Sequence, residues 1–314
     1  MIQLFNINDY KIDTSEFSHA LHSYHVKELE DMLCEFVGAK YACGLSSATN
    51  AIFLASLGKG ENFKIPSMIP PVVVNATLNA GNKVEFINDV DWVGDSYILH
   101  TFENYKIVDS AQKVVENQFT KECNDEDLMF YSFYPTKPIG SLDGGMIFSN
   151  DESKINWFRE ASLNGMTYSQ ENWNRNLKFP GWKMYLSSFQ AKIAIENFKK
   201  IKEKNSRLEE IRSRYNDAFG YENSSYHLYR IDVTNRKDFI EKMKKENVST
   251  GIHYYCAHKM KAYEKITSCN SDMSLSESKE KTTVSIPFHE KLTEDEVKKI
   301  IEAVKMSGNL INEF

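Results

Sequence analysis

Cysteine, proline and long apolar runs are scarce in this chain, and each shortage excludes a class of protein. The 314 residues include five cysteines and seven prolines. The cysteines are odd in number and widely spaced, which is typical of reduced thiols in a cytosolic protein and not of a disulfide scaffold. No apolar run approaches the length of a membrane span, and the first residues do not resemble a secretory signal. We therefore expect a cytoplasmic protein without a membrane partner.

Basic residues are also too few for a protein that binds nucleic acid through its phosphates. The formal net charge is -6 at pH 7 and the pI is about 5.8. This balance argues against a nucleic-acid partner, although a local anion site stays compatible with it. Hydrophobic residues make up 41% of the chain, which is enough for one large domain or two unequal ones.

Hydrophobic periodicity predicts strands that alternate with helices, the pattern of an α/β protein. An amphipathic helix is expected at Val26–Val37, capped by Gly38. A long helical region is expected at Ser187–Phe219, with a break near Asn205. The predicted strands are Tyr41–Leu45, Phe63–Ile65, Lys83–Ile87, Tyr97–His100, Tyr105–Val108, Leu128–Phe133, Tyr226–Val233, Thr250–Tyr254 and Thr283–Pro287. We expect a larger domain at residues 1–204 and a smaller α/β domain at residues 205–314.

One lysine, Lys137, lies between a predicted buried strand and a glycine-rich turn. Pro135 and Pro138 bracket it and keep it out of the interior of a helix or strand. A lysine held in this way can act as a Schiff-base nucleophile. Exposed loop lysines are more common, however, so this stretch alone favours the ordinary interpretation.

Two other stretches offer the partners that such a lysine would need. Ser46–Thr49 lies between a strand and a helix, where backbone N–H groups can bind a phosphate, although helix capping would explain it equally well. Asp109 ends a strand, at the edge of the sheet where parallel α/β proteins bind ligands, although it is also a fitting helix cap. A phosphate site, a carboxylate and an amine are together what pyridoxal phosphate requires.

Two groups of histidines are candidates for a metal site. His19, His22 and His25 recur at a spacing of three, and a straight helix spreads such a row too widely for one ion. The segment 253–258, HYYCAH, has a zinc-like spacing but lacks a fourth ligand. We therefore predict no metal site.

The chain resembles the DegT/DnrJ/EryC1/StrS family of sugar aminotransferases, which are pyridoxal-phosphate enzymes of fold type I. The resemblance rests on blocks in the family's order, namely GAKYACGLSSATNAIFLA, IVDSAQ, SFYPTKPIGSLDGGMIFSND, FQAKI, YHLYRIDV, TGIHYY and IPFHEKLTEDEV. The SFYPTK block followed by DGGM is the specific one. This resemblance implies a large domain with a mostly parallel central sheet and a smaller C-terminal α/β domain.

The resemblance also implies roles for single residues. Lys137 would carry the Schiff base, Asp109 would pair with the pyridinium nitrogen, and Gln112 would lie near the ring and its phenolic oxygen. The residues implied to hold the phosphate are Ala48, Thr49 and Ser132. Related dehydratases have histidine in place of the lysine, so Lys137 implies an aminotransferase, with glutamate as the usual amino donor. Family members are homodimers whose sites are completed by the partner subunit.

Several positions depart from the family pattern. Ala48 replaces a glycine, and Pro70 or Ile69 replaces the aromatic residue that stacks on the cofactor. The partner-subunit motif of the family reads N-x-R-M before the helix, and here it is replaced by Lys183-Met184-Tyr185-Leu186, of which Lys183 could contact the phosphate as a point charge. The segments before Tyr24 and between residues 91 and 105 are short.

These departures leave the acceptor open. The sequence favours a nucleotide-linked keto-deoxysugar, with a small phosphorylated ketone as the alternative. A non-catalytic binding or regulatory protein that keeps the fold is the alternative from another class.

Overall fold

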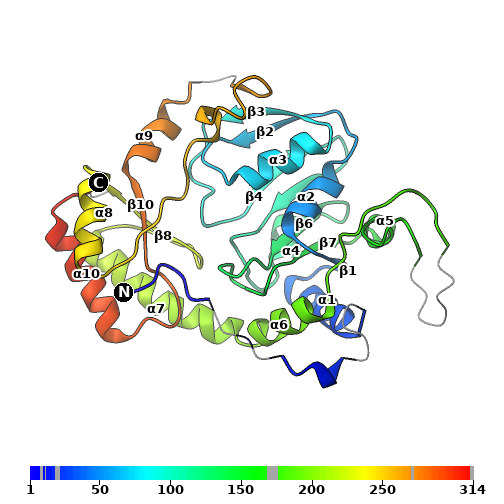
Figure 1. The fold of residues 1–314 in the computed structure, drawn as a ribbon, viewed down its shortest axis with the longest axis horizontal. Coiled ribbons are helices and arrows are strands. Elements are labelled where there is room, and N and C mark those ends of the chain that lie inside the picture. The colour runs from blue at the N-terminus through cyan, green and yellow to red at the C-terminus, as the bar shows by residue number, and fades with distance from the viewer. Residues whose placement is uncertain (8–9, 11, 18–21, 168–175, 270–271, 312–314) are drawn as a thin grey trace.

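The computed structural model describes residues 1–7, 10, 12–17, 22–167, 176–269 and 272–311. Two α/β units lie side by side, and the smaller contains strands β8 (Tyr229–Val233) and β10 (Thr283–Ile286) (Figure 1). Helices α6 (Ser188–Phe198) and α7 (Ile201–Phe219) run along one side from the larger unit to the smaller. No helix among the described residues is long and apolar enough to cross a membrane.

A five-stranded sheet forms the middle of the larger unit. Its order is β1 (Tyr41–Leu45), β7 (Gly145–Ser149), β6 (Leu128–Ser132), β5 (Lys106–Asp109) and β4 (Tyr97–Thr101). Only β5 and β6 are parallel neighbours in this sheet, because the pairs β1–β7, β6–β7 and β4–β5 are antiparallel. The α/β class is confirmed, but the prediction of a mostly parallel central sheet is wrong for this sheet.

The connection between β4 and β5 explains part of this difference. Residues 102–105 alone join the two strands, and the Phe102 N–H donates to the Tyr105 carbonyl over 2.8 Å. A connection this short reverses the chain, whereas a parallel crossover needs a dozen residues or more. A second sheet has only parallel pairs, and in it β3 (Lys83–Ile87) lies between β2 (Asn62–Pro66) and β9 (Ser268–Cys269).

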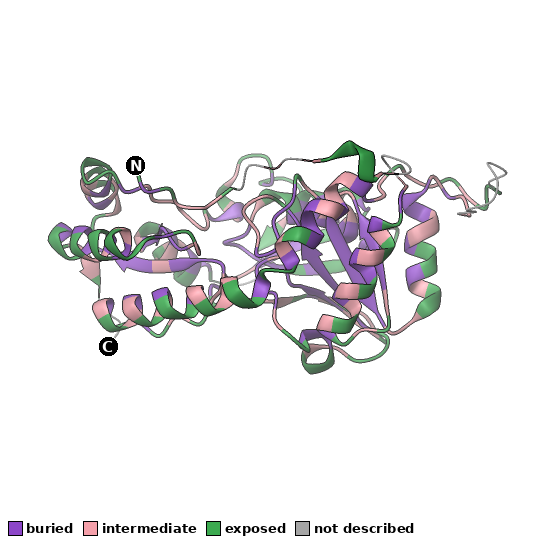
Figure 2. Ribbon diagram, turned by 90° about the horizontal axis from the view of Figure 1, so that it is seen from below, coloured by how far each residue is buried: buried purple, intermediate pink, exposed green. Residues whose placement is uncertain are grey.

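Helices cover both faces of the five-stranded sheet, whose strands β1, β5, β6 and β7 are largely buried, whereas β4 at the edge is partly exposed (Figure 2). Helix α1 (His25–Val37) buries Leu29, Leu33 and Val37 against one face, as its periodicity predicts, and Gly38 ends it in the left-handed conformation. The other helices of the larger unit are α2 (Ala48–Ser56), α3 (Pro71–Asn79), α4 (Gln118–Glu122) and α5 (Glu152–Ser162).

The smaller unit has its own apolar core. Its elements, besides β8 and β10, are α8 (Arg236–Lys245), α9 (Ser274–Thr282), α10 (Glu294–Ser307) and β11 (Leu310–Ile311). The core begins at Leu208 but also includes Ile2, whereas Tyr263 and Met273 pack in the core of the larger unit. The division between residues 204 and 205 therefore stays a prediction.

Three local expectations differ from the structure. The long helical region breaks at Lys199–Lys200 and not near Asn205. The segment predicted as a strand at Thr250–Tyr254 is irregular apart from one bridge between Gly251 and Ser285. The polar segment predicted after residue 268 contains helix α9.

The first residues of the chain pack on the smaller unit. Ile2 donates its N–H to the Asn247 carbonyl over 2.7 Å and accepts from the Ser249 N–H over 2.9 Å. The Phe5 ring stacks on His227 with centroids 5.7 Å apart, and its edge meets His253 at 5.8 Å. The chain's beginning is thereby fixed next to residues that follow it by more than 200 positions.

Candidate active site

The start of helix α2 forms a cradle for an anion. The Ser47 side chain accepts from the Asn50 N–H over 3.1 Å and caps the helix. The N–H groups of Ala48 and Thr49 belong to the first turn, where no intrahelical acceptor is available. These donors and the positive end of the helix dipole suit a phosphate.

Strand pairing brings Ser132 and Gly145 to this cradle. Gly145 pairs with Leu45 on one side and with Ser132 on the other. A Cβ added at Gly145 would lie 2.6 Å from the Ala48 nitrogen, so only glycine allows this close approach. Ala48, Thr49 and Ser132, the residues predicted to hold a phosphate, therefore lie at one end of the sheet.

Asp109 ends the neighbouring strand β5 and is only 4% exposed. Its carboxylate accepts from the Tyr97 hydroxyl over 2.9 Å and from the Ala111 N–H over 2.9 Å. Burial raises the pKa of this carboxyl, while the bonds from Ala111 and Tyr97 and the charge of Lys137 oppose the rise. A buried carboxylate with spare acceptor capacity suits a cationic ring nitrogen.

Lys137 lies in the turn that follows β6. Its N–H donates to the Tyr134 carbonyl over 2.8 Å, and the turn closes where the Ser141 N–H donates to the Phe133 carbonyl over 2.8 Å. The Lys204 ammonium on α7 donates to the Pro138 carbonyl over 3.0 Å. The turn is thus held by its own backbone and by the helix that leads to the smaller unit.

The surroundings of Lys137 change its basicity. Burial lowers the pKa of its ammonium to about 8, although the charge of Asp109 opposes this shift. Burial also lowers the pKa of His253 to about 4 and that of His227 well below its usual value, and the positive charge of Lys137 adds to both shifts. Two neutral imidazoles at neutral pH therefore lie near an amine that can release and take up a proton.

Gln112 lies beside Asp109 and is held from two sides. Its side-chain oxygen accepts from the Gly94 N–H over 2.8 Å, and its amide nitrogen donates to the Tyr254 hydroxyl over 3.0 Å. Its second amide hydrogen can serve a ligand. The structure therefore brings Asp109, Gln112 and Lys137 to the edge of the sheet that also holds the anion cradle.

Lys183 does not join this group within one chain. Its side chain is exposed, and its backbone pairs with Leu163. The next residue, Met184, accepts from the Ser46 N–H over 2.7 Å, so Lys183 lies along the segment that precedes the cradle. Ile69 is fully buried, and Pro70 is the extended residue that directly precedes helix α3.

The histidines that are candidate metal ligands have other partners in the structure. His19 lies outside the described residues. His253 bonds to Ser285 over 2.8 Å, whereas His258 bonds to Ser67 over 2.5 Å and to Glu277 over 3.2 Å. No group of three metal-ligating side chains is found in the part of the chain that the structure describes.

Three aromatic residues near Asp109 were not identified from the sequence. Trp92 packs on Tyr97 with centroids 4.7 Å apart and stacks on Tyr254 at 6.0 Å. No short motif marks them, because antiparallel pairing brings Tyr97 to Asp109 and Tyr254 comes from a distant segment. The one sequence signal that could have identified Trp92 and Tyr97 is the presence of aromatic residues in the short segment after β3.

A cavity of about 780 Å³ opens beside the Lys137 turn. Its lining joins the N-terminal segment to α6, α7 and residues 290–291, and it includes side chains of both charges, among them Lys204, Arg207 and Glu290. A space of this size is in the range of small-molecule sites.

Comparisons with known proteins agree with this arrangement. The profile described as the DegT/DnrJ/EryC1/StrS aminotransferase family matches residues 98–305. The chain is similar to UDP-4-amino-4,6-dideoxy-N-acetyl-beta-L-altrosamine transaminase of Campylobacter jejuni, with 27% identity over 89% of this chain and 90% of the relative. It is also similar to the spore coat polysaccharide biosynthesis protein SpsC of Bacillus subtilis, with 26% identity over 89% of this chain and 88% of the relative.

Solved structures share the fold. The aminotransferase TlmJ from Streptoalloteichus hindustanus aligns with a TM-score of 0.81 at 18% identity, covering 98% of both chains. Helicobacter pylori PseC, an aminotransferase involved in the biosynthesis of pseudoaminic acid, aligns with a TM-score of 0.76 at 17% identity, covering 97% of this chain and 99% of that chain. From the matched family profile, we conclude that the chain belongs to the DegT/DnrJ/EryC1/StrS aminotransferase family and is a pyridoxal-phosphate-dependent aminotransferase.

Proposed function

We propose that this enzyme transfers an amino group, with glutamate as donor, to the keto carbon of a nucleotide-linked deoxysugar. The acceptor class is supported by the Campylobacter jejuni relative, whose name specifies a UDP-linked amino sugar, and by the Bacillus subtilis relative named for polysaccharide biosynthesis. The chemistry rests on one observation, the Lys137 amine whose pKa burial lowers and whose charge acts on the buried Asp109 carboxylate.

Each group at the sheet edge has a task in this proposal. Bound pyridoxal phosphate supplies an aldehyde that combines with amines and a ring that accepts the electrons of a carbanion. The first turn of α2, at Ala48 and Thr49, and the Ser132 hydroxyl bind the phosphate. Asp109 keeps the ring nitrogen cationic, and Gln112 donates toward the ring oxygen.

Lys137 performs both covalent attachment and proton transfer. A pKa of about 8 leaves a useful fraction of the amine unprotonated at neutral pH, so that it can attack a carbonyl. The same value suits a group that takes a proton from one carbon and returns it to another. The turn held by Lys204 and by the Phe133 carbonyl keeps the amine in one place during this transfer.

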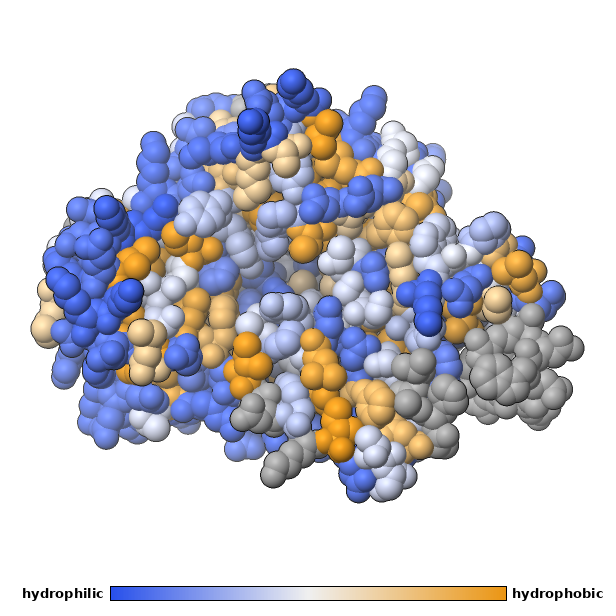
Figure 3. All heavy atoms as spheres, viewed as in Figure 1, coloured by the Kyte–Doolittle hydropathy of each residue, from blue (hydrophilic) through white to orange (hydrophobic). Residues whose placement is uncertain are grey.

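We also propose that a second copy of the chain completes the site. Three large apolar side chains near the Lys137 turn and the start of α1 are exposed, namely Tyr24 at 62%, Tyr134 at 55% and Leu142 at 52%. Apolar patches interrupt the polar surface on the face seen in Figure 3. In a dimer, the exposed Lys183 of one subunit would add a positive charge at the phosphate of its neighbour.

The acceptor is tested with purified enzyme, glutamate and two panels, nucleotide-linked keto-deoxysugars and small keto-phosphates. We expect 2-oxoglutarate to form in amounts equal to the amino sugar produced, and only with the first panel. Turnover with keto-phosphates alone would replace the proposed acceptor by the alternative class. Borohydride should fix the cofactor on the peptide that contains Lys137, and Lys137→Ala should abolish this labelling.

Shared sites are tested by mixing two inactive variants, Lys137→Ala and Lys183→Met. If Lys183 serves the neighbouring site, a mixed dimer contains one site with both lysines intact, and activity returns on mixing. If mixing restores nothing although mixed dimers form, Lys183 does not act across subunits.

A further inference from the structure

We propose that the segment from Trp92 to Tyr97, together with Tyr254, positions Asp109 and Gln112 for the cofactor ring. This inference rests on the proposed function, because it concerns the residues assigned there to the ring nitrogen and the ring oxygen. Trp92, Tyr97 and Tyr254 form a layer of side chains in contact with each other and with those residues. Trp92, Tyr97 and Tyr254 are positioning residues, since they act through Asp109 and Gln112.

The strongest contact in this layer joins Tyr97 to Asp109. The two residues are direct partners in the antiparallel pair β4–β5, so their side chains lie on the same side of the sheet. The Tyr97 hydroxyl donates to the carboxylate over 2.9 Å. Burial and the neighbouring carboxylate raise the pKa of the Tyr97 phenol well above its usual value, so the hydroxyl keeps its proton as a donor. A donor of this kind favours the ionised carboxylate that a pyridinium needs.

A second contact joins Tyr254 to Gln112. The Tyr254 oxygen accepts one amide hydrogen of Gln112 over 3.0 Å, and the Gly94 N–H donates to the side-chain oxygen of Gln112 over 2.8 Å. With both ends of the amide engaged, its orientation is fixed before any ligand binds. Gln112 thus presents a nitrogen donor, and not its oxygen, to the ring.

Trp92 ties the two tyrosines together. It stacks nearly parallel to Tyr254, with 7° between the ring planes, and packs on Tyr97 with centroids 4.7 Å apart. Its indole N–H has no hydrogen-bond partner in the described part of the chain, so ring packing determines its position. Trp92 therefore joins Tyr97, which bonds to Asp109, and Tyr254, which bonds to Gln112, in one aromatic cluster.

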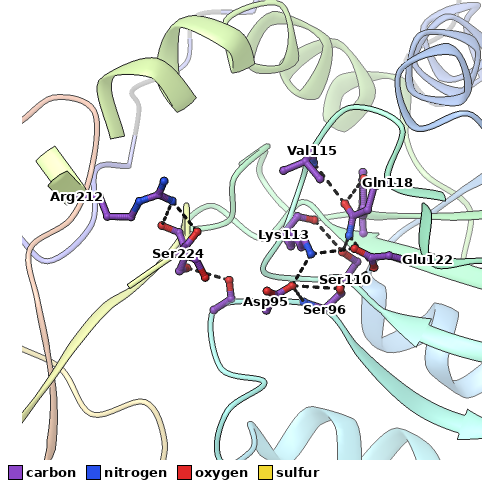
Figure 4. A network of polar contacts seen from close by, with 12 residues as sticks. Asp95, Ser96, Ser110, Lys113, Val115, Gln118, Glu122, Arg212 and Ser224 are labelled. Atoms are coloured by element: carbon purple, nitrogen blue, oxygen red, sulfur yellow. Dashed lines mark hydrogen bonds and ion pairs between the residues drawn. The ribbon is translucent and has the colours of Figure 1, made fainter. Parts of the chain in front are cut away.

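Charged and polar contacts anchor the same segment from outside (Figure 4). Lys113 forms ion pairs with Asp95 over 2.7 Å and with Glu122 over 2.9 Å, and the Ser96 hydroxyl donates to Glu122 over 2.6 Å. The Ser225 hydroxyl donates to the Gly94 carbonyl over 2.9 Å. These bonds fix Asp95 and Ser96 to Lys113 and to Glu122 at the end of α4, and they fix Gly94 to the segment that precedes β8. The segment is therefore rigid enough to position what it touches.

The test compares three tyrosine-to-phenylalanine variants that remove one hydroxyl each. Tyr97→Phe removes a hydrogen bond to a charged group, and Tyr254→Phe removes one to a neutral amide. Tyr215→Phe is the matched control, because its hydroxyl donates to the Pro287 carbonyl over 3.1 Å in the core of the smaller unit. Each purified protein is stripped of cofactor and titrated with pyridoxal phosphate, and its melting temperature is measured with and without the cofactor.

We expect the dissociation constant to rise roughly tenfold or more for Tyr97→Phe and about threefold for Tyr254→Phe, because hydrogen bonds to charged groups are the stronger ones. Tyr215→Phe should leave the dissociation constant unchanged. The cofactor should raise the melting temperature less for Tyr97→Phe than for the wild type, because ligand stabilisation follows affinity. In an Asp109→Asn background, Tyr97→Phe should lose its effect on binding.

The outcomes separate this inference from the proposed function. A wild-type protein that binds no pyridoxal phosphate would overturn the function itself. A wild type that binds, with Tyr97→Phe binding equally tightly, overturns only the positioning role. Equal weakening in Tyr97→Phe and Tyr215→Phe would also overturn it, since the effect would then be general destabilisation. If Tyr97→Phe does not fold, Tyr254→Phe decides, and an unchanged affinity in that variant counts against the inference.

Discussion

Replacing Lys137 by methionine should stabilise the cofactor-free protein while destroying its proposed chemistry. Methionine keeps the aliphatic stem and removes the charge, so the packing of the turn changes little. The pKa of the Lys137 ammonium falls from its usual 10.5 to about 8 in the folded chain. At neutral pH the group is nevertheless mostly protonated, which means that the fold holds a charge in a site that disfavours it.

The size of the effect follows from linkage between protonation and folding. Each pKa unit corresponds to about 1.4 kcal/mol, so the protonated lysine costs about 3 kcal/mol of stability below pH 8. Between pH 8 and 10.5 the unfolded chain binds the proton and the folded chain does not, so the stability of the wild type rises with pH in this window. The advantage of Lys137→Met should therefore shrink to about 1.4 kcal/mol at pH 9.5.

Urea unfolding of both cofactor-free proteins at pH 7 and at pH 9.5 measures this difference. The control is Lys83→Met, an exposed lysine at the start of β3, whose stability should stay within about 0.5 kcal/mol of the wild type at both pH values. Equal stability of Lys137→Met and wild type at pH 7 would refute the reasoning. So would an advantage that does not decrease at pH 9.5, because it would then come from packing and not from charge.

Three further predictions concern residues around the site. Glu30→Ala should lower the free energy of unfolding in urea by about 3–5 kcal/mol, because Glu30 is 2% exposed, accepts the Gly44 N–H over 2.9 Å and pairs with Arg159 over 2.8 Å; a loss below about 1 kcal/mol would contradict it. Gly145→Ala should weaken pyridoxal phosphate binding roughly tenfold or more, measured by titration, because its Cβ would meet the Ala48 nitrogen at 2.6 Å. Binding at wild-type strength would show that the cradle tolerates the methyl group. Asp109→Asn should reduce the transamination rate roughly a hundredfold or more in steady-state assays without unfolding the protein, because the positive charge on the cofactor's ring nitrogen would lose its carboxylate partner. An unchanged rate would show that Asp109 has no part in the mechanism.

The parts of the site that were predictable from the sequence are those marked by local chemistry. The prolines around Lys137, the small residues before α2 and the carboxylate at the end of β5 each depend on neighbours in the chain. The antiparallel β4–β5 pair was missed because the resemblance suggested parallel strands, and the short connection at residues 102–105 outweighs that expectation. Tyr97 therefore could not be assigned to Asp109 from sequence alone.

Elements held by polar contacts were also hard to predict. Helix α9 buries Ser276 and Glu280 in place of an apolar stripe. The Ser276 N–H and hydroxyl both donate to Asn88 over 2.7 Å, and Glu280 accepts the Cys256 N–H over 2.9 Å. Hydrophobic periodicity contains no information on such partners, which lie far away in the sequence.

The docking of the first residues on the smaller unit has a consequence for biosynthesis. Ile2 leaves the ribosome before its backbone partners Asn247 and Ser249, which are made about 245 residues later. At ordinary elongation rates this interval lasts roughly ten to fifty seconds. During that time the larger unit can begin to fold, but the residues of the smaller unit that Ile2 and Phe5 contact have not yet been made. Nascent chains truncated before residue 247 should therefore leave this N-terminal segment open to proteases, and completion of α8 and of the residues that follow it, up to Ser249, should protect it.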